Sequence, residues 1–262
     1  MNQAVPPGEF KDHFSGHAQD YARHRPGYPE ALFSWLAKRC NRHQLAWDCG
    51  AGNGQASGAL ARHFEVVIAT DPSAEQLKHA PPISGVEFRL APAEASGLDR
   101  ASVDLVAVAQ ALHWFDLDRF YAEVRRVLRP GGLVAAWTYI QVEVNPEVDA
   151  VVRHLYENVL GAYWPPERRL VETGYADLPF PFEPLATPAF EACERWDLAA
   201  FTGYLGSWSA SRRYQQLKKA NPLEKVEDSL AQAWGTPGVV RRVRWPLALR
   251  VGRHSAVLAV QS

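Results

Sequence analysis

Seven consecutive residues combine an acid with three evenly spaced glycines: Asp48-Cys49-Gly50-Ala51-Gly52-Asn53-Gly54. Glycine lets the backbone take positive φ, and it lets a ligand approach the main chain because it has no Cβ. An apolar run, Leu45-Ala46-Trp47, precedes the stretch, and apolar residues at four-residue steps follow it from Ala56 to Phe64. This pattern predicts a strand, a glycine turn and a helix whose first N–H groups are unpaired.

A second acid follows at the end of the next apolar run, Val66-Val67-Ile68-Ala69-Thr70-Asp71. An acid at the tip of the second strand can accept hydrogen bonds from both hydroxyls of a ribose. Asp48, beside the turn, would repel a pyrophosphate, whereas it suits a ligand with an ammonium group. The two acids therefore predict a nucleoside ligand that also carries positive charge.

The pattern from Asp48 to Gly54, with Asp71 at this distance, resembles motif I of the class I S-adenosylmethionine-dependent methyltransferases. The string Leu128-Arg129-Pro130-Gly131-Gly132 before an apolar run resembles the same family, as does Gln110-Ala111-Leu112-His113-Trp114. The likeness is to small-molecule members of type 11, of the trans-aconitate methyltransferase kind. It spans nearly the whole chain.

The resemblance implies S-adenosyl-L-methionine as cofactor and S-adenosyl-L-homocysteine as product. Glu94 would accept a hydrogen bond from the adenine amino group, and Gln110 would contact the methionine part. An N-terminal lid would bring Tyr21 and Arg25 to the methionine part, where Arg25 would pair with the carboxylate. The implied cofactor residues are Tyr21, Arg25, Asp48, Gly50, Gly52, Gly54, Asp71, Pro72, Ser73, Ala93, Glu94 and Gln110.

On the acceptor side, the resemblance implies direct displacement of the methyl group by a nucleophile. His113 is the candidate catalytic residue, either as a general base or as a packing or orienting residue. The aromatic C-terminal half favours a small organic acceptor, with a carboxylic acid as one candidate. A carboxylate acceptor would need no base, whereas a hydroxyl or an amine could use His113. The expected substrate pocket contains His113, Trp114, Tyr139 and Trp164.

Strands that alternate with helices predict an α/β fold. The resemblance makes it a Rossmann-like, seven-stranded, mostly parallel sheet with an antiparallel last strand and helices on both faces. We expect an N-terminal lid and first helix over residues 1–41. A methyltransferase domain over 42–262 would carry acceptor-pocket elaborations from about 140 to 235. Apolar patterns predict strands over 133–137, 190–196 and 243–251 and helices over 148–160 and 222–234.

Composition narrows the classes of partner. The chain has 262 residues and a net charge of −1, which gives no electrostatic case for nucleic acid. It has no apolar run long enough to span a membrane and no signal pattern from Met1 to Phe10. The three cysteines show no metal-binding spacing and suit a reducing compartment. We expect a cytoplasmic monomer or homodimer without a metal.

Two other functions remain open at the level of sequence. A nicotinamide-dependent oxidoreductase also uses a glycine turn, but its glycine spacing differs from that of Gly50, Gly52 and Gly54. The other alternative is a protein that binds S-adenosylmethionine without catalysis, and no residue of the sequence excludes it.

Overall fold

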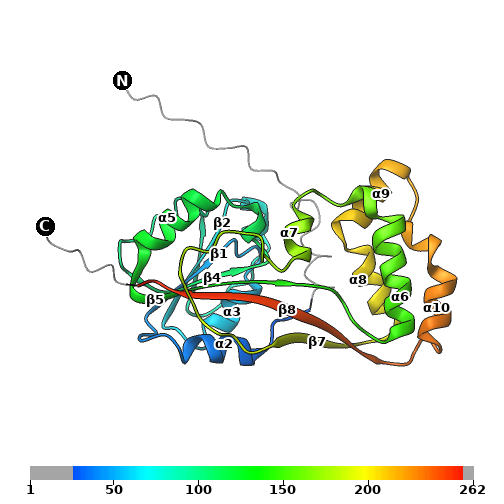
Figure 1. Cartoon of the computed structure of the whole chain (residues 1–262), viewed down its shortest axis with the longest axis horizontal. Helices are drawn as coiled ribbons and strands as arrows, with labels where there is room; N and C mark the ends of the chain where they lie inside the picture. The colour runs from blue at the N-terminus through cyan, green and yellow to red at the C-terminus, as the bar shows by residue number, and fades with distance from the viewer. Residues whose placement is uncertain (1–25, 256–262) are drawn as a thin grey trace, which may run out of the picture.

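Five neighbouring parallel strands make up most of the sheet in the structure, a computed structural model that describes residues 26–255 (Figure 1). The strand order is β3-β2-β1-β4-β5-β8-β6, with β7 also paired to β8. The parallel strands are β1 Leu45–Cys49, β2 Val66–Asp71, β3 Val86–Leu90, β4 Val103–Ala109 and β5 Leu128–Tyr139. This arrangement confirms the predicted α/β class and its mostly parallel sheet.

The last strand, β8 (Arg241–Arg253), runs antiparallel to β5 on one edge and to both β6 and β7 on the other. The short β6 (Glu183–Pro184) pairs with the end of β8, and β7 (Phe190–Trp196) pairs with its beginning. Because β8 alone is reversed relative to its neighbours, the predicted antiparallel last strand is confirmed.

Alternating residues of the central strands pack against helices on the two faces of the sheet. Ala46 and Leu105 belong to the core cluster that contains residues of α2 and α3, whereas Trp47 and Val106 belong to the cluster that contains Phe120. The helices around the sheet are α2 Glu30–Ala37, α3 Gln55–Leu60, α4 Ala74–Lys78 and α5 Leu117–Val127. The parallel strands are therefore covered on both faces, as their continuous apolar sequences require.

The C-terminal helices gather beyond one end of the sheet, and the short α7 lies between them and the strands (Figure 1). The gathered helices are α6 Pro146–His154, α8 Leu198–Gly206, α9 Ser209–Lys218 and α10 Glu227–Trp234, and α7 is Arg168–Glu172. Asp197 caps α8 by accepting the N–H of Ala200 at 2.9 Å. These helices and the long β5 and β8 frame one side of the region where the strands end.

Three predicted boundaries differ from the structure. The helix expected over 148–160 changes at Leu155 into a π-helix, Leu155–Val159, and the helix expected over 222–234 begins as a 3-10 turn, Pro222–Lys225. The strand expected from residue 133 begins at Leu128. Here Leu128 pairs with Val103 of β4, and Gly131 donates its N–H to the carbonyl of His254. Pairing on both sides therefore extends the strand through a sequence that looks like a turn.

Within the described part of the chain, no helix combines the length and the apolar character that crossing a membrane requires.

Candidate functional site

The three glycines of the turn after β1 all have a left-handed backbone, with φ of 71° at Gly50, 56° at Gly52 and 84° at Gly54. A Cβ added at Gly50 would lie 2.6 Å from the Cβ of Ala111, and one at Gly54 would lie 2.6 Å from Cζ of Phe88. A larger residue would therefore be strained and would collide with its neighbour. The predicted glycine turn is built at the carboxyl end of β1.

Asp48 lies at the base of this turn and is completely buried. Ser57 of α3 donates its hydroxyl to Oδ2 at 2.5 Å, whereas Oδ1 has no hydrogen-bond partner among residues 26–255. Burial raises the pKa of Asp48 to about 7, the hydrogen bond from Ser57 opposes this rise, and the charge of Asp71 adds to it. Because a buried oxygen without a donor is costly, the position favours a bound cation or N–H donor.

Asp71 joins the glycine turn to the loop after β2. Its Oδ2 accepts the N–H of Gly52 at 2.9 Å, and its Oδ1 accepts the N–H of Ser73 at 2.8 Å. Ser73 in turn accepts the N–H of Gln76 at 3.3 Å and caps α4. The two bonds from Gly52 and Ser73 hold Asp71 at the carboxyl end of β2, beside the glycine turn. The proposed contact of Asp71 with a ribose stays a prediction.

The loop after β3 carries Ala93 and Glu94. Ala93 is buried, and Oε1 of Glu94 accepts the N–H of Asp116 at 2.9 Å. Asp116 is the N-terminal cap of α5, so Glu94 connects this loop to the segment that follows β4. The two loops therefore meet at the carboxyl ends of the strands, where ligands of such sheets bind.

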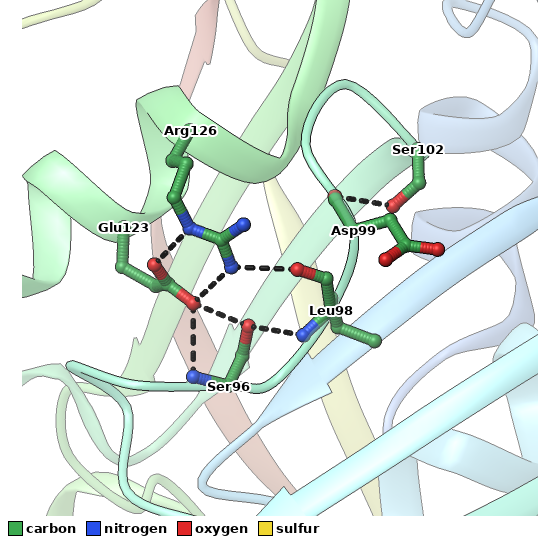
Figure 2. Close-up of polar contacts among 6 residues, drawn as sticks. All are labelled: Ser96, Leu98, Asp99, Ser102, Glu123 and Arg126. Carbon is green, nitrogen blue, oxygen red and sulfur yellow. Dashed lines mark hydrogen bonds and ion pairs between the residues drawn. The ribbon is translucent and has the colours of Figure 1, made fainter.

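Glu123 of α5 fixes the same loop from its other end (Figure 2). Its Oε1 accepts the N–H and the hydroxyl of Ser96, at 2.9 and 2.5 Å, and Arg126 donates to both carboxylate oxygens. Arg126 also donates to the carbonyl of Leu98 at 2.6 Å. The hydrogen bond from Arg126, helped by Ser96, lowers the pKa of Glu123 to about 2. A buried carboxylate thus holds the segment that follows Ala93 and Glu94.

Gln110, directly after β4, has a left-handed backbone with φ of 59° although it is not glycine. This conformation costs about 1 kcal/mol or more for a residue with a Cβ. Its N–H donates to the carbonyl of Trp137 at 2.9 Å, and its Oε1 accepts the hydroxyl of Thr138 at 2.8 Å. Its Nε2 is buried and has no partner in the described chain. Such strain with an unused donor is typical of functional positions.

His113 lies on the 3-10 turn Leu112–Trp114, and its Nδ1 lies 2.9 Å from the hydroxyl of Tyr175. Burial, and after it the positive charge of Arg168, lowers the pKa of His113 to about 3. The imidazole is therefore neutral at neutral pH and is a weaker base than an ordinary histidine. It can hold a neighbour or a ligand by a hydrogen bond more readily than it can take a proton.

A cavity of about 60 Å³ lies beside the ends of β4 and β5. Gln110 lines it from the sheet side, and helices α6 to α9 supply much of the opposite wall. Its aromatic lining residues are Tyr139, Tyr156, Trp164, Tyr204, Trp208 and Trp245. Tyr139 and Trp164 were both expected in an acceptor pocket. His113 and Trp114 are not among the residues that line this cavity, and they lie on the nearby turn after β4.

Sequence reasoning did not identify Tyr156 or Arg168, which both line the cavity. Tyr156 lies in the π-helix, where helical periodicity gives no warning of a change in direction. Arg168 lies four residues after Trp164 in the aromatic, proline-rich segment. This closeness in sequence to a predicted pocket residue could have identified Arg168 as a candidate.

Two predicted cofactor residues, Tyr21 and Arg25, lie outside the described residues. The described chain begins at Pro26, whose carbonyl accepts the side-chain N–H of Gln55 at 2.9 Å and the hydroxyl of Tyr139 at 2.6 Å. Gln55 is the first residue after the glycine turn. The chain that follows the predicted lid is therefore fastened between this turn and the end of β5.

Metal-binding geometry is not found in the described part of the chain, which contains no group of three or more His, Cys, Asp or Glu side chains that could hold an ion. Cys40 and Cys49 are buried and Cys193 is exposed, and all three are free thiols.

Comparison with known proteins gives consistent results. The family model described as a methyltransferase domain matches residues 47–136. A Dictyostelium discoideum protein inferred to be a methyltransferase is 34% identical over 241 residues, which are 90% of this chain and 92% of that protein. A Saccharomyces cerevisiae protein inferred to be an S-adenosylmethionine-dependent methyltransferase is 35% identical over 133 residues, which are 47% of this chain and 45% of that protein.

A solved structure is also similar over most of the chain. It is that of a protein from Anaeromyxobacter dehalogenans inferred to be a type II methyltransferase. Its sequence is 52% identical, and the two structures match with a TM-score of 0.84 over 88% of this chain and 98% of the other.

Proposed function

The chain belongs to the class I S-adenosylmethionine-dependent methyltransferases, and we propose that it methylates a small organic acceptor bound in the aromatic cavity. S-adenosylmethionine is its cofactor. The finer proposal concerns the acceptor, for which we favour a carboxylic acid. We also propose that residues of about 140 to 235, which include Tyr156 and Trp164, form the acceptor side of the site.

The residues around the glycine turn fit this cofactor. Oδ1 of Asp48 is buried without a partner in the described chain, which suits the ammonium group of a methionine part. At Gly50 and Gly54 any Cβ would already clash within the protein, and the bare turn leaves the backbone open to a close ligand. We propose that Asp71 binds the ribose and that Ala93 and Glu94 flank the adenine.

One observation carries the proposed place of the acceptor. Gln110 follows β4, next to the glycine turn in the sheet order, and it also lines the aromatic cavity. Its strained backbone and its Nε2, which has no partner in the described chain, favour a role in binding a ligand. The cavity therefore adjoins the edge of the sheet where the cofactor residues converge. A methyl group at that edge and an acceptor in the cavity would be neighbours, and holding them so is the main task of the protein.

The chemistry of the surrounding residues favours an acceptor that is already nucleophilic. When bound, S-adenosylmethionine supplies a methyl group on a positively charged sulfur that leaves as a neutral thioether. Aromatic walls exclude water from a reaction in which charge is dispersed. His113, whose pKa is about 3, is a poor general base. A carboxylate needs no deprotonation at neutral pH, whereas an alcohol would need a better base than His113.

An assay of methyl transfer tests this proposal. The protein is incubated with S-adenosylmethionine and panels of small carboxylic acids, alcohols and amines, and the S-adenosylhomocysteine that forms is measured. We expect turnover with carboxylic acids, retained in a His113→Asn variant to within about tenfold, because the base is not needed. The proposal of a carboxylic acid acceptor would be contradicted if only alcohols or amines were methylated and if His113→Asn abolished this turnover. That result would support His113 as the general base. Tight cofactor binding with no turnover on any panel would favour a non-catalytic binding protein.

A further inference from the structure

One charged side chain, that of Arg168, lies among the described residues that line the cavity. Its Nε donates to the hydroxyl of Tyr156 at 2.7 Å. Its guanidinium carbon lies 4.8 Å from the ring centre of Trp164 and 5.3 Å from that of Tyr156. Aromatic rings and one hydrogen bond thus hold the guanidinium in place.

The two Nη groups of the guanidinium have no partner within the described part of the chain. Among residues 26–255, no carboxylate forms an ion pair with Arg168, and neither Nη group donates a hydrogen bond. Arginine presents its Nη groups as a planar fork that fits the two oxygens of a carboxylate. With Nε already bonded to Tyr156, Arg168 offers the cavity this end-on fork.

Two hydrogen bonds fix the position of the Tyr156 hydroxyl. Tyr156 lies in the π-helix Leu155–Val159, and its hydroxyl donates to Oε1 of Glu172 while it accepts from Arg168. Burial is the main cause that raises the pKa of Tyr156 to about 12, so the hydroxyl keeps the proton that it donates. π-helical turns recur at functional sites. A chain of hydrogen bonds therefore runs from Arg168, which lines the cavity, through Tyr156 to Glu172.

The charge of Arg168 is not cancelled by this chain. Glu172 is exposed to solvent, which screens its charge, whereas Arg168 is half-buried against aromatic rings. Its positive charge reaches His113, where it contributes to the lowered pKa. Since no acid is among the lining residues of the described chain, the cavity is an electropositive and largely aromatic chamber.

From this geometry, and resting on the proposed function, we propose that Arg168 is the residue that selects the acceptor by gripping its carboxylate with both Nη groups. Tyr156 and Glu172 are positioning residues that aim the guanidinium. Trp164 provides a flat wall for the body of the acceptor. A neutral analogue of the same shape lacks the anionic oxygens for the fork and is rejected.

Ligand-observed NMR on the protein loaded with S-adenosylhomocysteine measures this selection without needing turnover. The probes are crotonate, succinate and benzoate, each paired with its neutral amide. We expect each carboxylate that fits to bind at least about tenfold more tightly than its amide, which corresponds to about 1.4 kcal/mol. Arg168→Gln should remove this preference, and Arg168→Lys, which keeps the charge but loses the fork, should leave an intermediate one. Arg169→Gln, an exposed neighbour on α7, is the matched control and should change nothing.

Tyr156→Phe and Glu172→Gln test the positioning role. In both variants the preference for carboxylate over amide should fall several-fold, while binding of the amides stays the same. A loss of both classes to the same degree would show a general collapse of the cavity and would overturn the positioning role.

The outcomes separate this proposal from the proposed function. Equal binding of carboxylates and amides to the wild type, or an unchanged preference in Arg168→Gln, would overturn the role of Arg168 even if methyl transfer were observed. A strong preference that depends on Arg168 would support it even if no acceptor were turned over.

Discussion

Ser57 and Asp48 form a buried hydrogen bond of 2.5 Å between α3 and β1, directly beneath the glycine turn. The bond satisfies only one oxygen of Asp48, and the other has no donor in the described chain. The strand and the helix that flank the turn are thus joined by a carboxylate that is incompletely satisfied without a ligand.

The stability of the ligand-free protein should depend on the charge of Asp48. The pKa of this carboxyl is about 7 in the folded state, against an ordinary value of 3.8. Between these values the folded state binds more protons than the unfolded state, so the free energy of unfolding falls as pH rises. We expect Asp48→Asn to be more stable than the wild type by about 1–4 kcal/mol at about pH 8, and by much less at about pH 4. Urea denaturation at both pH values measures the difference.

The same substitution should weaken binding of S-adenosylhomocysteine at about pH 8, because the ammonium group loses its anionic partner, by roughly tenfold or more. The exposed Asp177→Asn is the control and should alter neither property. An equal gain in stability at both pH values would contradict the raised pKa, because it would show that Asp48 has the same pKa in the folded and unfolded states.

Two glycines near the turn should respond oppositely to alanine. Gly54 has φ of 84° and a Cβ there would lie 2.6 Å from Phe88, so Gly54→Ala should cost about 2 kcal/mol or more. Gly58 lies inside α3, where a Cβ would meet only Ile83 at an ordinary 3.5 Å. Gly58→Ala should therefore stabilise the protein by about 0.5–1 kcal/mol. Thermal unfolding of both variants tests this, and a destabilised Gly58→Ala would contradict the packing described for α3.

The backbone strain at Gln110 can be isolated by comparing two truncations. Gln110→Ala and Gln110→Gly both lose the hydrogen bond with Thr138, but only alanine keeps a Cβ at φ of 59°. We expect the glycine variant to be more stable than the alanine variant by about 1 kcal/mol in urea denaturation. Turnover should fall in both variants, because both lose the side chain that links the turn after β4 to the cavity. A more stable alanine variant would mean that the left-handed backbone is not maintained in solution.

Loss of the carboxylate charge at Glu123 should loosen the loop after β3. Glu123→Gln removes charged hydrogen bonds to Arg126 and Ser96, and we expect it to cost about 2 kcal/mol at neutral pH. Because the pKa of Glu123 is lowered to about 2, its contribution is present above the ordinary value of 4.5 and is lost as pH falls toward 2. The exposed Glu65→Gln serves as control. A cost that stays constant down to about pH 2 would contradict the ion pair as its source.

The strand, turn and helix around Asp48 could be predicted from the sequence because the signal is local. Glycine spacing, the preceding apolar run and the following helical period lie within about twenty residues. The capping residues Ser73 and Asp197 were predictable for the same reason, since a cap and its partner are three residues apart.

Contacts between distant segments could not be predicted in the same way. Tyr175 meets His113 across 62 positions of the sequence, and only the folded chain shows that burial leaves this histidine with a low pKa. The role of Arg168 depends on a π-helical turn at Tyr156 that continues α6 without any break in the apolar pattern. Likewise, β5 begins early because Leu128 pairs with Val103 of β4 and Gly131 donates its N–H to the carbonyl of His254, more than 120 residues further along the chain.

Calorimetric titration with S-adenosylhomocysteine, with NAD as a control ligand, tests the central claim most directly. The wild type should bind S-adenosylhomocysteine and not NAD, and Asp71→Ala should weaken binding by roughly tenfold or more, or about 1.4 kcal/mol, as it loses a charged hydrogen bond. Failure of the wild type to bind S-adenosylhomocysteine, or preferential binding of NAD, would contradict the cofactor site built by Asp48, the glycine turn and Asp71.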